Sequence, residues 1–154
     1  MSAIIRPMER SDIAAAATLR HAIFFDGSER TVAEDAAGLE KLLGGDGFEA
    51  ALVAEVDRKL VGNCLLVREE LDLDYDQRPW LAGLLVAPQY RKRGIGSRLV
   101  AAIEGHARSV GCEALYLYTH GAEAFYTTLG WTVAERFLQH GDPAVVMSKD
   151  LRLG

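Results

Sequence analysis

The sequence predicts an α+β fold with a mixed β-sheet, and two patterns carry this prediction. The run at 80–86 is apolar on both faces, which is typical of a buried central strand, and a helical stretch and a strand at 114–118 follow it. Two strands with one helix between them form a βαβ unit, so these strands should be parallel. Strand-like runs at 48–56 and 60–71 flank a tight polar turn and should pair as an antiparallel hairpin.

The other elements are placed from their end signals. Ser11 and Asp12 are good helix caps before one periodic apolar stretch, and Thr31 with Glu34 fits a capping box before another. The remaining expected elements are an edge strand at 3–5, a short helix at about 122–129, and final strands at 131–137 and 143–149. The order is strand, two helices, three strands, helix, strand, helix and two strands.

The helix that starts near Gly94 has an apolar stripe and should end at Gly111. The stripe recurs at helical spacing and should face the core: Leu99, Val100, Ile103 and Ala107. The polar residues expected to face solvent are Glu104, His106 and Arg108.

Composition indicates a single domain over residues 1–154, with 49% hydrophobic and 25% charged residues. No apolar run approaches the roughly 20 residues of a spanning helix, and no secretion signal is visible, so we expect a cytoplasmic protein without membrane contact. The net charge of −5 argues against nucleic acid as the main partner. Cys64 and Cys112 lie far apart and fit no metal-ligand spacing, so we expect reduced thiols and no metal.

The segment VAPQYRKRGIGSRL at 86–99 carries the main functional signal. Its Gly94 and Gly96 let the backbone turn tightly and approach a ligand closely. The first amides of the following helix lack internal partners and carry the positive end of the helix dipole, which favours a phosphate. The basic patch of this acidic chain lies in the same segment and consists of Arg91, Lys92 and Arg93.

Two common phosphate-binding motifs do not fit this segment. A Walker loop requires Lys and then Ser or Thr after its last glycine, whereas Ser97 and Arg98 follow Gly96. A dinucleotide fingerprint requires a third glycine where Leu99 stands. A turn that uses glycine only for packing stays open as an alternative.

The stretch L-L-V-A-P-x-Y-R-x-R-G-I-G-S, followed by A-x-x-F-Y-x-x-L-G-W, closely resembles the GNAT family of N-acetyltransferases. The resemblance is strongest over 80–131, and the expected element order is similar to that fold from end to end. It implies an α/β/α sandwich with a mostly antiparallel sheet, whose fourth and fifth strands are parallel and splay apart. It also implies acetyl-CoA as cosubstrate and transfer of its acetyl group to a primary amine of a small molecule or peptide.

The same resemblance implies how the cofactor lies. The diphosphate rests on the amides of the glycine loop, and the pantetheine arm runs along the fourth strand like an added strand. The implied contacts are Leu84, Leu85, Val86, Arg91, Lys92, Arg93, Gly94, Ile95, Gly96, Ser97 and Thr119. Thr119 stands where the family often has Asn, so a hydroxyl with fewer hydrogen bonds replaces an amide there.

Tyr126 matches the family tyrosine near the thioester sulfur, which implies a general-acid role. The departing thiol has a pKa of about 8.5 and a phenol about 10, so the tyrosine must lie hydrogen-bonded close by or have a lowered pKa. The backbone N–H of Val86 is the implied donor to the oxyanion. No nucleophile is apparent, so we expect direct transfer in a ternary complex and no acyl-enzyme on Cys112.

The general base and the acceptor stay open. The candidate bases are Glu69, Glu70, Asp72, Asp74, Asp76 and His120, with a water chain as an equal alternative. The acidic loop at 69–76 also suits a cationic acceptor such as a polyamine, an aminoglycoside or a lysine side chain. A non-catalytic acyl-CoA-binding or sensing domain, a protein amino-terminal or lysine acetyltransferase, and an interaction module are alternatives. Many family members form homodimers, so a homodimer is a further open expectation.

Overall fold

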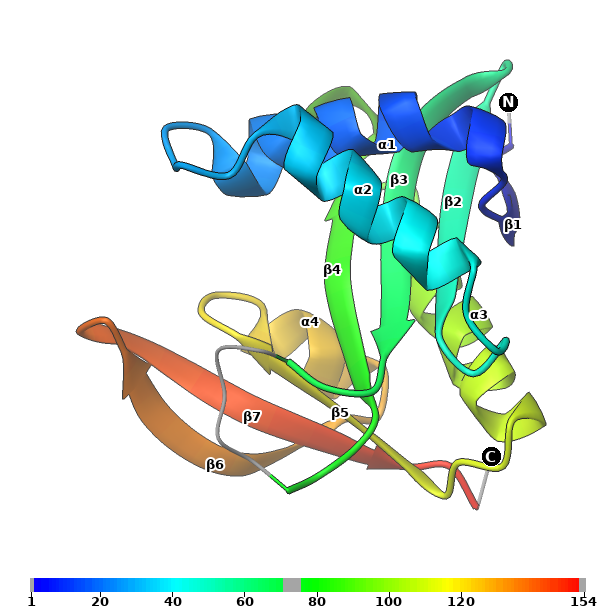
Figure 1. Ribbon diagram of the computed structural model, residues 1–154. Helices are drawn as coiled ribbons and strands as arrows, with labels where there is room; N and C mark the ends of the chain where they lie inside the picture. Colours follow the sequence, from blue (N-terminus) through cyan, green and yellow to red (C-terminus); the bar gives the residue numbers. More distant parts are fainter. Residues whose placement is uncertain (1, 71–75, 153–154) are drawn as a thin grey trace.

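The structure, a computed structural model, describes residues 2–70 and 76–152 and places a seven-stranded sheet among four α-helices (Figure 1). The strands are β1 (Ile4–Pro7), β2 (Ala50–Val56), β3 (Lys59–Val67), β4 (Trp80–Val86), β5 (Ala114–Thr119), β6 (Thr132–Gln139) and β7 (Asp142–Asp150). The α-helices are α1 (Ile13–Arg20), α2 (Val32–Leu43), α3 (Ile95–Ser109) and α4 (Glu123–Thr128). The predicted order of strands and helices is confirmed.

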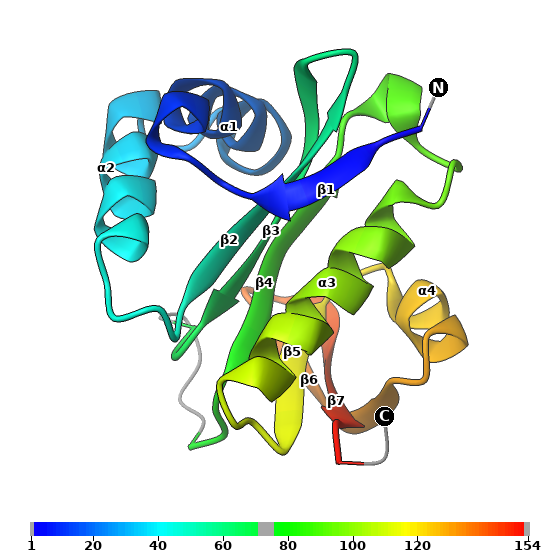
Figure 2. The ribbon, with the colours of Figure 1, turned by 90° about the vertical axis from the view of Figure 1, so that its right-hand side faces the viewer.

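Helices cover both faces of the sheet. The strand order is β1-β2-β3-β4-β5-β7-β6, and every neighbouring pair is antiparallel except β4 with β5. Figure 2 shows α1 and α2 on one face and α3 and α4 on the other. The predicted α+β fold, an α/β/α sandwich with a mixed sheet, is therefore confirmed.

The parallel strands β4 and β5 meet at one end and then separate. Their register holds a single pair, Trp80 with Tyr116, and the Tyr116 N–H donates to the Pro79 carbonyl at 3.1 Å. Beyond that point the two ribbons diverge (Figure 1). The predicted splay is confirmed, and it leaves one edge of β4 without a strand partner.

The apolar core has one part on each face of the sheet. The larger part lies under α3 and includes Leu66, Leu99 and Leu115, each 0% exposed. The smaller part lies under α1 and α2 and includes Ala16 and Val53. Burying an aliphatic side chain of this size contributes about 1.5–3 kcal/mol, so the two layers hold the sheet from both sides.

Two expectations about helix ends have different outcomes. The capping box of α2 is confirmed, because Glu34 N–H donates to Thr31 Oγ1 at 3.0 Å and Thr31 N–H donates to Glu34 Oε1 at 2.9 Å. Asp12, by contrast, does not cap α1 with its side chain. It accepts from the Glu9 N–H at 2.7 Å and closes a short 3₁₀ turn (Arg10–Asp12) before the helix.

Two other expectations are corrected by the structure, and the first helix has an end that the sequence did not predict. Glu104 does not face solvent: its side chain is 7% exposed, because partners from distant elements surround it. The strand predicted at 60–71 ends at Val67. The first helix stops at Arg20 and continues as a π-helical turn (His21–Phe25) with wider hydrogen-bond spacing.

Two further expectations concern the state of the cysteines and the presence of a membrane-spanning helix. Cys64 is buried, Cys112 is half-buried, and both are free thiols, as predicted. Within 2–70 and 76–152, the helices are all too short or too polar to cross a bilayer.

Candidate active site

Helix α3 begins at the glycine-rich turn that the sequence predicts. Gly94 is its N-cap with φ at 81°, a left-handed conformation that favours glycine, and Lys92 also has a positive φ of 64°. The turn is exposed, and no side chain caps the helix. The amides of residues 95–97 consequently have no hydrogen-bond acceptor in the described parts of the chain.

Gly96 lets the first turn of α3 approach two other elements. A Cβ at this position would lie 3.5 Å from Cζ of Phe125 and 3.9 Å from Cγ2 of Val86. The start of α3, the end of β4 and α4 therefore converge at one place. A larger residue here would press against both neighbours.

The arginines beside the turn are held against its backbone. Arg91 Nε donates to the Val86 carbonyl at 2.9 Å. The Arg93 guanidinium lies 5.2 Å from the Tyr90 ring centroid and donates weakly to the Gln89 carbonyl at 3.4 Å. These contacts keep positive charge next to the free amides, which is the chemistry that a diphosphate requires.

The free edge of β4 has an unpaired amide at Val86. The Ala87 N–H donates to the Val61 carbonyl at 2.7 Å, so Ala87 faces β3. Because backbone groups alternate along a strand, the N–H and C=O of Val86 point the other way, into the gap beside β5. Arg91 Nε donates a hydrogen bond to the Val86 carbonyl, and the Val86 N–H faces the gap.

The register with β3 separates the other predicted β4 contacts. Leu85 faces β3, where it pairs with Asn63, whereas Leu84 lies between the pairs at Leu85 and Ala82 and has no register partner on β3. A ligand lying along β4 would therefore meet the backbone of Leu84 and Val86 but not that of Leu85.

A β-bulge distorts β4 just before this edge. Asn63 pairs with Leu85 but Leu65 pairs with Ala82, so β4 holds one extra residue opposite β3. Gly83 has a φ of 62° and supplies the conformation that the bulge requires.

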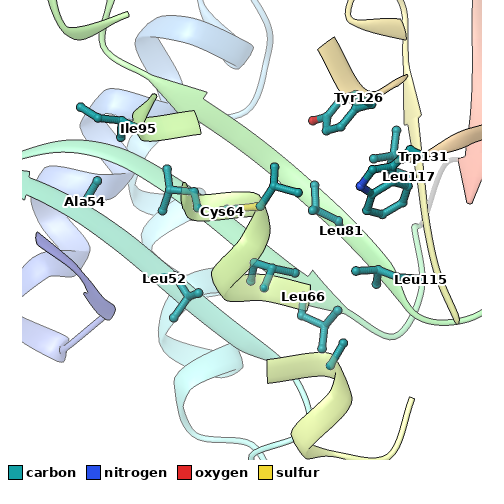
Figure 3. Close-up of a cluster of buried hydrophobic side chains, with 14 of the residues drawn as sticks. Leu52, Ala54, Cys64, Leu66, Leu81, Ile95, Leu115, Leu117, Tyr126 and Trp131 are labelled. Atoms are coloured by element: carbon teal, nitrogen blue, oxygen red, sulfur yellow. The ribbon is translucent and has the colours of Figure 1, made fainter. Parts of the chain in front are cut away.

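Tyr126 lies in α4, 6% exposed, in a cluster of aromatic rings. Its ring centroid is 5.0 Å from that of Phe125 and 5.9 Å from that of Trp131. Figure 3 shows the phenolic oxygen pointing away from Trp131. The hydroxyl has no hydrogen-bond partner within the described residues.

Burial raises the pKa of Tyr126 above its usual value, and the nearby Cys64 thiol adds to this effect. The phenol is therefore protonated at neutral pH. A tyrosine can act as the acid if its pKa is lowered or if it is hydrogen-bonded close to the leaving sulfur. The pKa of Tyr126 is not lowered in this structure. A close hydrogen bond to the leaving sulfur is the remaining way for Tyr126 to act.

Thr119 and His120 line a cavity of about 470 Å³ at the end of β5. Thr119 Oγ1 accepts from the Ala122 N–H at 3.2 Å, so this hydroxyl shapes the entry to α4. His120 Nδ1 lies 3.1 Å from the Pro143 carbonyl and Nε2 lies 2.7 Å from Gln139 Oε1. Both partners are carbonyl oxygens, which only accept, so His120 donates a hydrogen bond to at least one of them, and the tautomer decides which ring nitrogen is the donor.

The acidic candidate bases are less well defined. Glu69 forms an exposed ion pair with Arg78 at 2.7 Å, and Asp76 is exposed. Asp72 and Asp74 lie outside the described residues. Among the residues that the structure describes, no three His, Cys, Asp or Glu side chains are grouped to hold a metal ion.

Sequence reasoning missed a buried ion pair on the other face of β4. Arg20 Nε donates to Asp35 Oδ2 at 2.8 Å, and the two side chains are 10% and 1% exposed. Neither residue belongs to a helix-cap or glycine pattern. Because charged residues on helices are ordinarily solvated, the sequence gives no reason to expect that they are buried. Only the packing of α1 on α2 reveals them.

Comparison with known proteins places this geometry in a family. The acetyltransferase (GNAT) family model matches residues 15–131. A mycothiol acetyltransferase of Kineococcus radiotolerans is 34% identical over 113 residues, which cover 71% of this chain and 35% of that protein. The chain thus spans about a third of the length of this curated relative.

Solved structures show the same fold. An N-acetyltransferase of Staphylococcus aureus has a TM-score of 0.81 at 15% identity, with 99% of this chain and 100% of that chain covered. A phosphinothricin acetyltransferase of Sinorhizobium meliloti, solved in complex with AcCoA, has a TM-score of 0.80 at 19% identity and covers 100% of this chain and 91% of its own. Since the family match spans most of the sequence, and the glycine turn and splayed strands lie within it, the chain belongs to the GNAT family of acetyltransferases.

Proposed function

We propose that this protein transfers an acetyl group from acetyl-CoA to a primary amine of a small molecule or peptide. One observation carries the proposal: the free amides of residues 95–97, the end of β4 at Val86 and helix α4, which holds Tyr126, converge at the open edge of β4. They provide three different kinds of donor, and acetyl-CoA has an acceptor for each. The relative from Sinorhizobium meliloti, solved with AcCoA, supports the choice of cosubstrate.

The diphosphate of acetyl-CoA binds at the start of α3. The amides of residues 95–97 donate to its oxygens, and the helix dipole adds favourable charge. Arg91, Lys92 and Arg93 surround the same point, although this acidic chain has a net charge of −5. The local positive charge attracts the anion against the field of the rest of the protein.

The pantetheine arm lies in the gap between β4 and β5. Its amide groups pair with the backbone of Leu84, as an added strand does, and the Val86 N–H is left for the thioester oxygen. This pairing needs an unoccupied strand edge, and β5 leaves one because it pairs with β4 only at Trp80. The thioester then lies beside α4.

The reaction is a direct transfer. The amine lone pair attacks the thioester carbonyl carbon, and the oxyanion accepts a hydrogen bond from the Val86 N–H. The C–S bond then breaks, the amide forms, and coenzyme A leaves as a thiolate that accepts a hydrogen bond from the Tyr126 hydroxyl. The amine proton passes to a base, for which His120, in the lining of the cavity at the end of β5, is a described candidate.

The proposal is tested by two measurements on one preparation. Calorimetric titration with acetyl-CoA should show binding at one site per chain, and release of free thiol should depend on an added amine. Absence of binding contradicts the proposal. Binding without amine-dependent thiol release supports the alternative of a non-catalytic acyl-CoA-binding domain.

A further inference from the structure

Arg20, at the end of α1, carries a buried donor that no atom of the described residues satisfies. Its Nε and Nη2 donate to Asp35 at 2.8 and 3.3 Å, which fixes the plane of the guanidinium. The side chain is 10% exposed, and within 2–70 and 76–152 the buried Nη1 has no hydrogen-bond partner. Buried charged donors are almost always paired, so an unpaired one indicates a ligand or another polar group.

The unpaired nitrogen lies directly against the bulge of β4. A Cβ at Gly83 would come within 2.6 Å of Arg20 Nη1, so the missing side chain of this glycine provides the space for the guanidinium. Gly83 directly precedes the segment at 84–86 that we assign to the pantetheine arm. Arg20 thus lies against β4 beside that segment, on the face of the sheet that α1 covers.

Aromatic rings hold the guanidinium from the side of the π-helical turn. The centroids of Phe24 and Phe25 each lie 5.8 Å from Arg20 Cζ. A π-helical turn is wider than an α-helical one, so residues four and five positions onward both lie over Arg20. Phe24 is 42% exposed, so the guanidinium lies close to the surface on this side.

The charge at this place favours an anion. Asp35 also pairs with Arg30 at 3.1 Å, so two guanidinium groups share one buried carboxylate. Arg20 consequently keeps both a free donor and an incompletely balanced charge. A carboxylate oxygen satisfies both, and arginine binds carboxylates with favourable geometry.

The two faces of the sheet then have separate tasks. We place acetyl-CoA on the face that carries α3 and α4, where the free amides and Tyr126 lie, which leaves the face that carries α1 and α2 for the amine (Figure 2). We propose, building on the function proposed above, that Arg20 Nη1 binds a carboxylate of the acceptor. The acceptor is accordingly an amino acid or another amine with a carboxylate close to the amine.

The experiment compares pairs of acceptors that differ only at this group, such as α-amino acids and their α-carboxamides. Rates are compared at equal concentrations of unprotonated amine, because the two amines differ in basicity. We expect kcat/KM to favour the carboxylate acceptor by about 10- to 100-fold, the range for a hydrogen bond to a charged group. Equal use of both acceptors by the wild-type protein overturns the proposal.

Variants test whether a preference for the carboxylate acceptor depends on Arg20. Arg20→Gln should abolish the preference for the carboxylate while leaving acetyl-CoA affinity unchanged. Arg30→Gln is the matched control, because it also loses a pair with Asp35 but has no contact with Gly83, and it should keep the preference. If Arg20→Gln does not fold, Arg20→Lys keeps the charge without the planar fork and should reduce the preference.

The outcomes separate this inference from the proposed function. A wild-type protein that fails to bind acetyl-CoA refutes the function itself. A wild-type protein that acetylates both acceptors equally refutes only the carboxylate subsite. A variant at Arg20 that slows both acceptors equally shows that the residue merely braces the bulge, which also overturns the subsite.

Discussion

The carboxylate of Glu104 accepts a hydrogen bond from the indole Nε1 of Trp131 at 3.2 Å, in the interior between α3 and the start of β6. Lys149 Nζ of β7 donates to the same carboxylate at 2.8 Å and to the Leu129 carbonyl at 2.8 Å. This polar group ties three elements together. It also fixes Trp131, on which the ring of Tyr126 packs.

Removing this carboxylate should lower stability. We expect Glu104→Leu to reduce the free energy of unfolding by about 2–4 kcal/mol, because it leaves the Trp131 donor and the Lys149 charge unpaired. Urea unfolding measures the effect. Glu40→Leu is the control. In its ion pair, the side chains of Arg10 and Glu40 are 68% and 59% exposed, so the free energy of unfolding should change by no more than about 0.5 kcal/mol. Equal stability of the two variants would contradict the structural role of Glu104.

Gly94→Glu should abolish acetyl-CoA binding. The substitution puts bulk and negative charge where we place the diphosphate, at a residue with φ of 81°. Gly111→Glu is the matched control at the other end of α3, because Gly111 also has a positive φ, 88°, and open space around its Cβ position. Calorimetry should show no binding for the first variant and wild-type affinity for the second. Unchanged affinity of Gly94→Glu would refute the loop assignment.

Tyr126→Phe should slow the reaction without weakening the binding of acetyl-CoA. The phenylalanine keeps the ring contacts with Phe125 and Trp131 but removes the donor to the leaving thiolate. We expect kcat to fall by about 10²-fold or more and the Kd for acetyl-CoA to change less than about twofold. The unfolding free energy at neutral pH should not fall, since the hydroxyl has no partner among the described residues. A wild-type rate at all pH values would remove Tyr126 from the mechanism.

The same substitution should change the stability at high pH. Burial raises the pKa of Tyr126 in the folded state above the value of about 10 in the unfolded chain. The folded state therefore holds this proton more tightly, and stability is kept below pH 10 and decreases as the pH rises further. Unfolding between about pH 9 and 11 should show a steeper loss for the wild-type protein than for Tyr126→Phe. Parallel curves would mean that this phenol is not buried in solution.

Direct transfer predicts that Cys112 is dispensable. Burial raises the pKa of the Cys112 thiol, which leaves it a poorer nucleophile at neutral pH. Cys112→Ser should keep turnover within about twofold, and initial-rate plots against both substrates should intersect. Parallel plots, together with loss of activity in this variant, would instead indicate an acyl-enzyme.

Local signals made much of the site predictable. The glycines at 94 and 96, the apolar run at 80–86 and the capping box at Thr31 each depend on residues within a few positions of one another. Such short-range patterns restrict backbone conformation directly, so the turn, the central strand and the helix start all match the structure. The family resemblance added the splay of β4 from β5, which the single pair at Trp80 confirms.

The sequence by itself determined which elements form, their order, and where the helix that presents free amides begins. Only the tertiary structure decided that Glu104 is buried, because its partners Trp131 and Lys149 lie 27 and 45 residues away. It also decided that the Arg20 guanidinium lies on the bulge at Gly83. Burial and pairing of a charged side chain depend on which distant elements pack around it, and no local pattern encodes that packing.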